Sequence, residues 1–195
     1  AGLDSAALVR VASELAARRI ILIPTLVLHD TFSRLDDRAV LQDTMLKAVP
    51  LIDQRAWNVP DLIARAGWTD SDYPAFRNAR PKQDLFLRLF AAAGGRIAAG
   101  TDASNQLLIP GYTLHREMQL LVAAGFSAQD ALLAATRTGA VLLGADSLGL
   151  IAPGKVADLV VLSRDPGAEI GNTLAIDKVM LRGRLLSADS IRTAW

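Results

Sequence analysis

The 195-residue sequence contains no cysteine, which excludes a disulfide framework and a thiolate metal site within this chain. It also lacks a large excess of either charge, because its net charge is +1 and its basic residues are scattered. This balance gives no reason to expect binding to nucleic acid or to an anionic membrane surface. We therefore expect no nucleic-acid partner and no membrane partner.

No apolar run in the sequence is long enough to span a bilayer. The longest, Ile20 to Leu28, is interrupted by Pro24 and Thr25 and has about half the required length. No signal peptide is visible, since the start lacks a charged segment followed by an apolar one. Apolar residues nevertheless occupy 51% of the positions, which is enough for a sizeable core.

The amino-terminal part shows a helical pattern followed by a strand pattern. Asp4 can serve as the N-cap of a helix, and Ile20 to Leu28 predicts a strand buried on both faces of a parallel sheet. We expect the strand that precedes this helix to lie upstream of Ala1. Residues 30–80 combine several prolines with large apolar residues, which predicts a helical insertion.

Regular alternation of helix and strand resumes after residue 80. Apolar residues at helical spacing predict helices around 85–90 and 114–122, and between them Arg96 to Thr101 predicts a short strand. That strand runs directly into Asp102. In β/α barrels the carboxyl ends of the strands form the catalytic face, so we expect Asp102 to lie where chemistry occurs. The alternative is that Asp102 only caps the following turn.

The chain changes character after Gly144. Asp158 to Leu162 predicts a buried strand, and Lys178 to Leu186 predicts another that is broken by a turn at Gly183. We therefore divide the chain into an α/β part, residues 1–145, and a small β-rich part, residues 146–195.

Several short motifs follow one another around and after Asp102. They are Gly100-Thr-Asp-Ala103, Leu114-His-Arg-Glu117, Gly149-Leu-Ile-Ala-Pro-Gly-Lys155 and Ala157-Asp-Leu-Val-Val-Leu162. In this order the series resembles the carboxy-terminal end of the amidohydrolase superfamily, most of all the branch that holds imidazolonepropionases, Xaa-Pro dipeptidases and related cyclic-amide hydrolases. The resemblance is continuous over about 96–186, weaker over 1–28, and only positional across 30–80.

The resemblance implies an α/β fold, a (β/α)8 barrel with a small β-sandwich formed by strands from both chain ends. Residues 1–145 would hold the carboxy-terminal part of the barrel, and 146–195 would hold part of the sandwich. Aromatic residues such as Trp57 and Tyr73 could make the 30–80 insertion a lid, or could pack it onto the barrel. We expect the chain to pair with the upstream part of the same enzyme, and the full enzyme to be a homo-oligomer.

The resemblance also implies metal-dependent hydrolysis of a carbon–nitrogen bond in a small molecule or peptide, such as a cyclic amide or lactam. The family's aspartate of the eighth strand maps onto Asp102, which would bind a divalent metal, with zinc as first choice and one or two ions. It would also accept a proton from metal-activated water and return it to the leaving nitrogen. The alternatives are a non-catalytic scaffold, or a fragment that is inactive unless paired with its upstream half.

Three further residues are candidates for substrate binding. His29 ends its predicted strand near the expected pocket mouth, or else caps a loop. Ser104 follows Asp102 on the catalytic face, where turn formation is the alternative. His115 belongs to a His-x-Glu pattern that many relatives share, and it either faces the pocket or hydrogen bonds within its helical region. Neither histidine falls on a metal-ligand position of the family.

Overall fold

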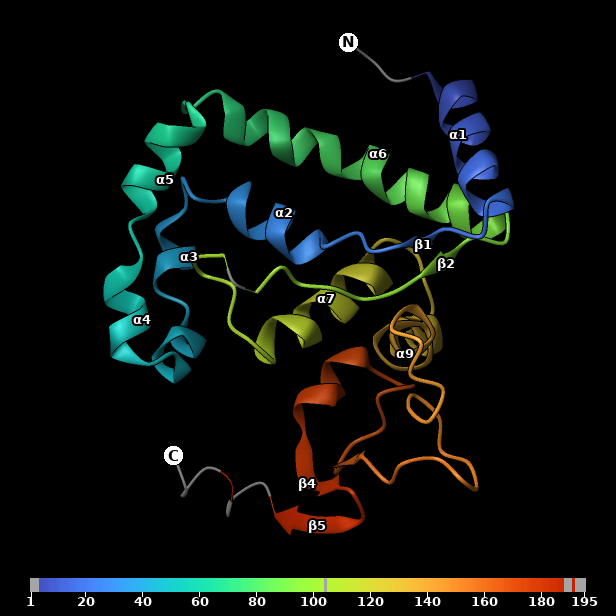
Figure 1. The fold of residues 1–195 in the computed structure, drawn as a ribbon. Helices are drawn as coiled ribbons and strands as arrows, with labels where there is room; N and C mark the ends of the chain where they lie inside the picture. Colours follow the sequence, from blue (N-terminus) through green and yellow to red (C-terminus); the bar gives the residue numbers. More distant parts are fainter. Residues whose placement is uncertain (1–3, 104, 188–190, 192–195) are drawn as a thin grey trace.

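The computed structural model describes residues 4–103, 105–187 and 191, so Ser104 lies outside the described residues. Helices dominate the first 145 residues, and two short strands lie among them (Figure 1). The elements are α1 (Ser5–Ala17), β1 (Ile21–Leu22), α2 (Leu26–Phe32), α3 (Arg38–Leu41), the 3-10 helix η1 (Thr44–Ala48), α4 (Leu51–Ala56), α5 (Val59–Ala66), α6 (Asp72–Ala92), β2 (Arg96–Ile97), α7 (Tyr112–Ala123), α8 (Ala128–Leu133), the π-helical turn η2 (Ala134–Thr138) and α9 (Gly139–Leu142).

The strands β1 and β2 are parallel neighbours, although the 73 residues 23–95 lie between them in the sequence. Ile21 lies beside Arg96 and Leu22 beside Ile97. The pairing continues one step further, because the N–H of Ala98 donates to the carbonyl oxygen of Leu22 at 2.9 Å. The carboxyl ends of the two strands therefore meet at one edge.

The prediction of a strand over residues 20–28 holds only for Ile21 and Leu22 and is wrong for the residues that follow. Strand pairing ends near Leu22, Thr25 adopts a left-handed φ of 45°, and α2 begins at Leu26. A left-handed residue turns the chain sharply, so the apolar residues that follow enter the core from a helix. His29 consequently lies inside α2 and does not end a strand.

The helix α6 is longer than the sequence pattern predicts. It runs without a break from Asp72 to Ala92 and includes Pro74 and Pro81. Pro74 falls in the first turn, where its missing N–H would have no intrahelical partner in any case. Pro81 removes one hydrogen bond from the helix interior. α6 packs along α1, as Figure 1 shows.

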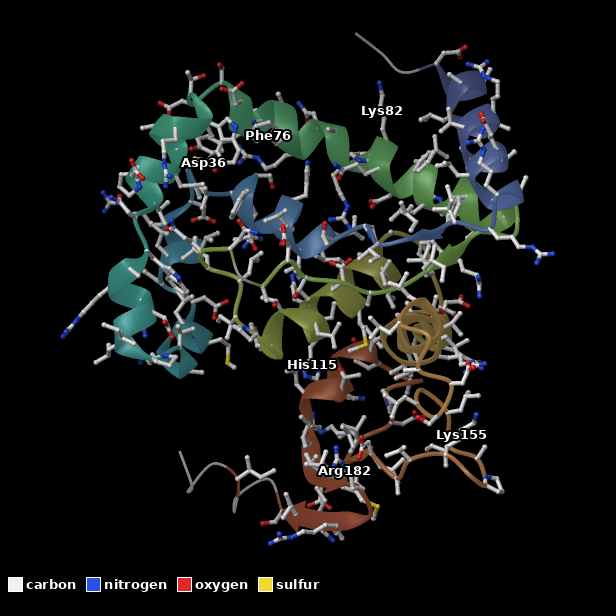
Figure 2. All side chains as sticks on the ribbon, in the orientation of Figure 1. Asp36, Phe76, Lys82, His115, Lys155 and Arg182 are labelled. Atoms are coloured by element: carbon white, nitrogen blue, oxygen red, sulfur yellow. The ribbon has the colours of Figure 1, made fainter. Side chains whose placement is uncertain are left out.

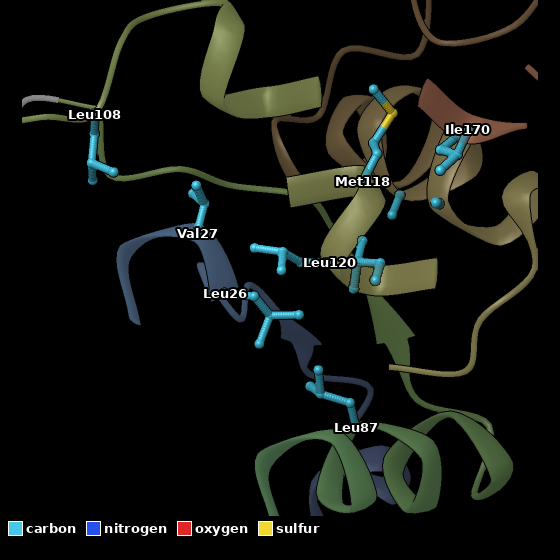
Figure 3. Packing of buried hydrophobic residues seen from close by; sticks show 10 residues of the cluster. Leu26, Val27, Leu87, Leu108, Met118, Leu120 and Ile170 are labelled. Atoms are coloured by element: carbon cyan, nitrogen blue, oxygen red, sulfur yellow. The ribbon is translucent and has the colours of Figure 1, made fainter. Parts of the chain in front are cut away.

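The main apolar core lies where α2, α6, α7 and α8 meet, and Figure 3 shows its packing. Its buried members are Leu26, Val27, Leu87, Leu108, Met118, Leu120, Leu121, Ala131, Ala134 and Ile170. Leu26 and Val27 follow Thr25 directly, so the chain passes from the end of β1 straight into this core. Their burial fixes the position of the edge that β1 and β2 share.

A second apolar cluster packs the 30–80 insertion. Its buried residues are Leu35, Val40, Tyr73 and Leu107. Partly buried aromatic residues surround them, and Trp68 packs edge-on against Phe32 and Phe76 with ring centroids 5.8 and 5.4 Å apart. The aromatic residues considered for a lid therefore contribute to packing, and a lid function for this segment stays a prediction.

The carboxy-terminal part contains a three-stranded antiparallel sheet in the order β3–β4–β5. Its elements are β3 (Leu159–Leu162), the 3-10 helix η3 (Ile170–Leu174), β4 (Ile176–Leu181) and β5 (Arg184–Ser187). The predicted turn at Gly183 is confirmed, since Arg182 and Gly183 both have positive φ, as tight hairpins require. The prediction that β3 is buried is wrong, because Val160 is 56% exposed.

Side chains cap the amino-terminal ends of α8 and α1, and the predicted N-cap at Asp4 is confirmed. The hydroxyl oxygen of Ser127 accepts from the N–H of Asp130, whose carboxylate accepts from the N–H of Ser127, both at 3.1 Å. The carboxylate of Asp4 likewise accepts from the N–H of Ala6 at the start of α1. Within the described part of the chain, no helix is both long and apolar enough to cross a membrane.

Gly100 lies where the segments that follow β1 and β2 approach most closely. A Cβ atom at this position would lie 2.3 Å from Cγ2 of Ile23 and 3.6 Å from Cγ2 of Thr25. The first distance is far shorter than a van der Waals contact. The glycine of the Gly-Thr-Asp-Ala motif is therefore required by the close approach of the two segments.

We predict that Gly100→Ala lowers the free energy of unfolding of the intact protein by about 1–3 kcal/mol, the usual cost of overpacking. Gly139→Ala is the matched control, because its added Cβ would meet only one atom, at 3.9 Å, in a helix. That change should be neutral or stabilise by up to about 1 kcal/mol. Urea unfolding of both variants tests this, and an equal effect at both positions would contradict it.

Candidate functional site

Asp102 lies in the segment that follows β2. The predicted strand over residues 96–101 is shorter than expected, because β2 ends at Ile97 and does not run directly into Asp102. The φ of Asp102 is 54°, and Thr25, in the segment that follows β1, has a φ of 45°. Aspartate tolerates the left-handed region because its short side chain crowds the backbone little, whereas a β-branched threonine is strained there. A Cβ atom at Gly100 would lie within 4 Å of Thr25, so the two left-handed turns lie at the same edge.

The backbone of Asp102 forms a tight turn, and its side chain is exposed. The carbonyl oxygen of Asp102 accepts from the backbone N–H of Asn105 at 3.0 Å and from Asn105 Nδ2 at 3.1 Å. Among the residues that the structure describes, the carboxylate has no hydrogen-bond or ion-pair partner. The turn thus uses the backbone and leaves the carboxylate available.

His29 lies half-buried in α2 and packs against α6. Its ring is 6.5 Å from that of Phe76 in an edge-on arrangement. Burial lowers the pKa of His29 and the charge of Arg80 lowers it further, against the opposing charges of Asp30 and Asp84. The ring is therefore neutral at pH 7, and its role in substrate binding stays a prediction.

His115 connects α7 to η3, as its position in Figure 2 shows. Its Nδ1 lies 2.9 Å from the hydroxyl oxygen of Thr173. That hydroxyl already donates its proton to the carbonyl oxygen of Ile170 at 2.9 Å. A hydroxyl has only one proton to donate, so Nδ1 of His115 must be the donor in its own bond. Burial lowers the pKa of His115, so this ring too is neutral at pH 7.

Glu117 is the fully buried acidic residue at this edge, with 0% of its surface exposed. Its two carboxylate oxygens accept from the N–H groups of Leu26, at 3.0 Å, and Val27, at 2.7 Å. These are the first N–H groups of α2, which have no acceptor within a helix. The N-cap residue Thr25 makes no side-chain bond to them. Glu117 therefore caps α2 from another helix.

The ionisation of Glu117 is tuned by opposing effects. Burial raises its pKa to about 7, while the N–H groups of Val27 and Leu26 and the charge of Arg80 act in the opposite direction. Arg80 is held nearby by Asp84, whose carboxylate accepts from Nε at 2.6 Å, and by the carbonyl oxygen of Leu120. The helix dipole at the start of α2 also favours a negative charge at this place.

The described residues do not assemble a metal site by themselves. No group of three or more histidine, aspartate or glutamate side chains lies close enough together within the described ranges to hold an ion. Asp102 and the two histidines therefore do not fit a metal as a set. A metal beside Asp102 would need its other ligands from elsewhere.

Comparison with models of known protein families shows to which family the chain belongs. The model of the amidohydrolase family matches residues 2–186. The chain belongs to the amidohydrolase family. This confirms the resemblance carried by the motifs around Asp102, and no match was found among curated proteins.

Solved structures of similar fold include three peptidase-like amidohydrolases. A Xaa-Pro dipeptidase with methionine bound in its active site is 23% identical, with a TM-score of 0.62 over 95% of this chain and 38% of its own. A prolidase complexed with N-methylphosphonate-L-proline is 22% identical, with a TM-score of 0.61 over 95% and 38%. A candidate prolidase from Bifidobacterium longum is 33% identical, with a TM-score of 0.53 over 64% and 31%. The amidohydrolase chain thus spans between 31% and 38% of their length.

We predict that Glu117 makes the stability of the amidohydrolase fall as pH rises from about 4.5 to 7. The folded state keeps the proton in this range while the unfolded state loses it, so unfolding is favoured by up to about 3 kcal/mol. Glu117→Gln removes the titrating group. Urea unfolding at several pH values measures the free energy of unfolding of both proteins. The difference between the two free energies should change with pH in this window.

The two buried histidines act in the opposite sense and provide an internal control. Their pKa values are lowered in the fold, so their contribution to stability is lost as pH falls below about 6.5. Both histidines are present in the native protein and in Glu117→Gln, so their contribution cancels when the two free energies of unfolding are subtracted. Parallel stability curves for the native protein and Glu117→Gln would contradict the role assigned to Glu117.

Proposed function

We propose that the protein hydrolyses a carbon–nitrogen bond in a cyclic amide, peptide or lactam-like substrate, with Asp102 as the group that moves the proton. The observation that carries this proposal is the carboxylate of Asp102, which has no partner among the described residues and follows the edge where both parallel strands end. Two left-handed turns and the close approach of Gly100 hold the backbone at this edge. A positioned carboxylate that is not used for structure is suited to proton transfer.

In the proposed reaction Asp102 accepts a proton from the attacking water and returns it to the leaving nitrogen. Water forms a new carbon–oxygen bond at the carbonyl carbon, the carbon–nitrogen bond breaks, and the products are a carboxylic acid and an amine. The left-handed turn sets the backbone from which the carboxylate projects, so the same carboxylate can make both transfers without movement of the backbone.

A divalent metal, with zinc as first choice, is part of the proposal. When bound, such an ion lowers the pKa of its water, and Asp102 would be one of its ligands. Since the described residues do not complete a ligand set, the others would come from the upstream part of the enzyme. His29 and, outside the described residues, Ser104 stay proposed substrate contacts, and so does His115 if its bond to Thr173 is exchanged.

We further propose that β1 and β2 are two strands of a (β/α)8 barrel completed by upstream residues, and that β3–β5 form part of a β-sandwich. Support comes from the fold of the similar structures, of which this chain covers 38%. The outer edges of β1 and β2 pair with no strand in the described part of the chain. Unpaired edges are avoided in stable sheets, so a partner segment is expected there.

We predict that Asp102→Asn in the intact protein lowers kcat for amide hydrolysis at least a hundredfold, the usual effect of losing a general acid–base group. The amide has the same shape but cannot accept the proton, so the unfolding midpoint should not change. Asp70→Asn is the matched control, because Asp70 is also exposed but lies in the 30–80 insertion. The measurement is turnover of a panel of dipeptides and cyclic amides.

Two results of this experiment would contradict the proposal. Equal turnover by Asp102→Asn and the native protein would remove Asp102 from the mechanism. A native protein that hydrolyses no member of the panel, with or without added zinc, would favour the non-catalytic scaffold.

A further inference from the structure

A cavity of about 290 Å³ lies between α2, the α3–η1 segment and the amino-terminal turn of α7. Its walls include Val27 and Arg34, which follow β1, and Leu107 and Ile109, which follow β2. The cavity therefore lies on the side of the molecule where both strands end. Its size is near the lower limit of about 300 Å³ for small-molecule pockets, so it would take a small ligand.

Arg34 contributes an unused cationic group to this cavity. Its Nε is buried and has no hydrogen-bond partner, and the rest of its side chain makes no hydrogen bond or ion pair with any described residue. Buried guanidinium donors are almost always paired in folded proteins. An acceptor that enters the cavity would supply the missing partner.

Arg116 is the second arginine of the cavity, and it has donors to spare. Its Nη2 lies 3.3 Å from Oδ2 of Asp30, and its Nη1 donates to Gln119 at 3.3 Å. A guanidinium has five N–H donors, so these two long bonds do not exhaust it. The other carboxylate of the lining, Asp43, accepts one hydrogen bond through Oδ1, from the N–H of Met45 at 2.9 Å.

Tyr112 adds a neutral donor. Burial and the charge of Asp43 raise the pKa of its hydroxyl, while Arg116 lowers it. The hydroxyl is therefore protonated at neutral pH. Among the described residues it donates no hydrogen bond, so it is free to donate to a ligand.

We propose that this cavity binds the carboxylate group of a small ligand, with Arg34, Arg116 and Tyr112 as the donors. Each carboxylate of the lining has a partner, because Asp30 pairs with Arg116 and Asp43 accepts from a backbone N–H. The buried Nε of Arg34 has none, so a ligand that supplies this missing acceptor is an anion. A planar guanidinium matches the two oxygens of a carboxylate in spacing and direction.

The identity of the ligand rests on the proposed function. Among the substrates of peptide-bond hydrolysis, a dipeptide or an N-acyl amino acid carries a carboxylate close to the scissile bond. The cavity would then hold this carboxylate, and substrates that lack it would bind weakly.

The test compares N-acetyl-L-alanine with N-acetyl-L-alaninamide, which differ only in carboxylate against carboxamide. Binding is measured by calorimetry with the intact protein in the Asp102→Asn background, so that turnover cannot interfere. We expect the acid to bind at least tenfold more tightly than the amide. Arg34→Gln should abolish this preference, and Tyr112→Phe should weaken it.

Arg65→Gln is the control, because Arg65 is an exposed arginine that pairs with Asp61 away from the cavity. It should retain the full preference for the acid. If Arg34→Gln fails to fold, Arg116→Gln and Tyr112→Phe still test the same site. Absence of acid binding, equal affinity for acid and amide, or an unchanged preference in all cavity variants would overturn the inference.

The two proposals fail separately. Hydrolysis of neutral cyclic amides without any preference for a carboxylate would overturn the cavity's role and leave the hydrolase function standing. Binding of the acid through Arg34 in a native protein that hydrolyses no amide would overturn the hydrolase function and leave the cavity's role standing.

Discussion

The carboxylate of Glu117 joins parts of the molecule that lie far apart in the sequence. It accepts hydrogen bonds from Leu26 and Val27, which precede it by 91 and 90 residues. Without an acceptor, these buried N–H groups would each cost about 1–3 kcal/mol, because water cannot reach them. The same carboxylate is costly to bury in its charged form. The position of α2, and with it the end of β1, depends on this one buried acid.

The edge that carries Asp102 follows from this constraint. Glu117 fixes the start of α2, which fixes the left-handed turn at Thr25. Thr25 and Ile23 in turn leave room only for a glycine at position 100, two residues before Asp102. A chain of close contacts thus runs from the core to the carboxylate proposed to carry the chemistry, and α2 continues from there into one wall of the cavity.

The sequence predicted what depends on local patterns. The N-cap at Asp4, the start of a strand at Arg96 and the hairpin turn at Gly183 each need only a few neighbouring residues, and each is present. The strand over residues 20–28 failed because its apolar residues satisfy a buried helix as well as a buried strand. The pattern could not reveal that Thr25 turns the chain.

The sequence did not predict that Glu117 caps α2, because its hydrogen-bond partners are backbone N–H groups, which every residue type except proline has. One signal was available: Glu117 lies three residues after Leu114 and four before Leu121, on the apolar face of its helix. An acidic residue there must find buried donors or face a site. Which of the two applies depends on the fold of a segment 90 residues away.

The most direct test of this account is the titration of Glu117, followed by the carbon-13 chemical shift of its carboxyl group in the intact protein. A buried carboxylate that caps α2 should titrate near pH 7, and the amide signals of Leu26 and Val27 should shift with the same midpoint. A midpoint near 4.5, with the two amide signals unaffected, would show that Glu117 is solvated and does not hold the end of β1.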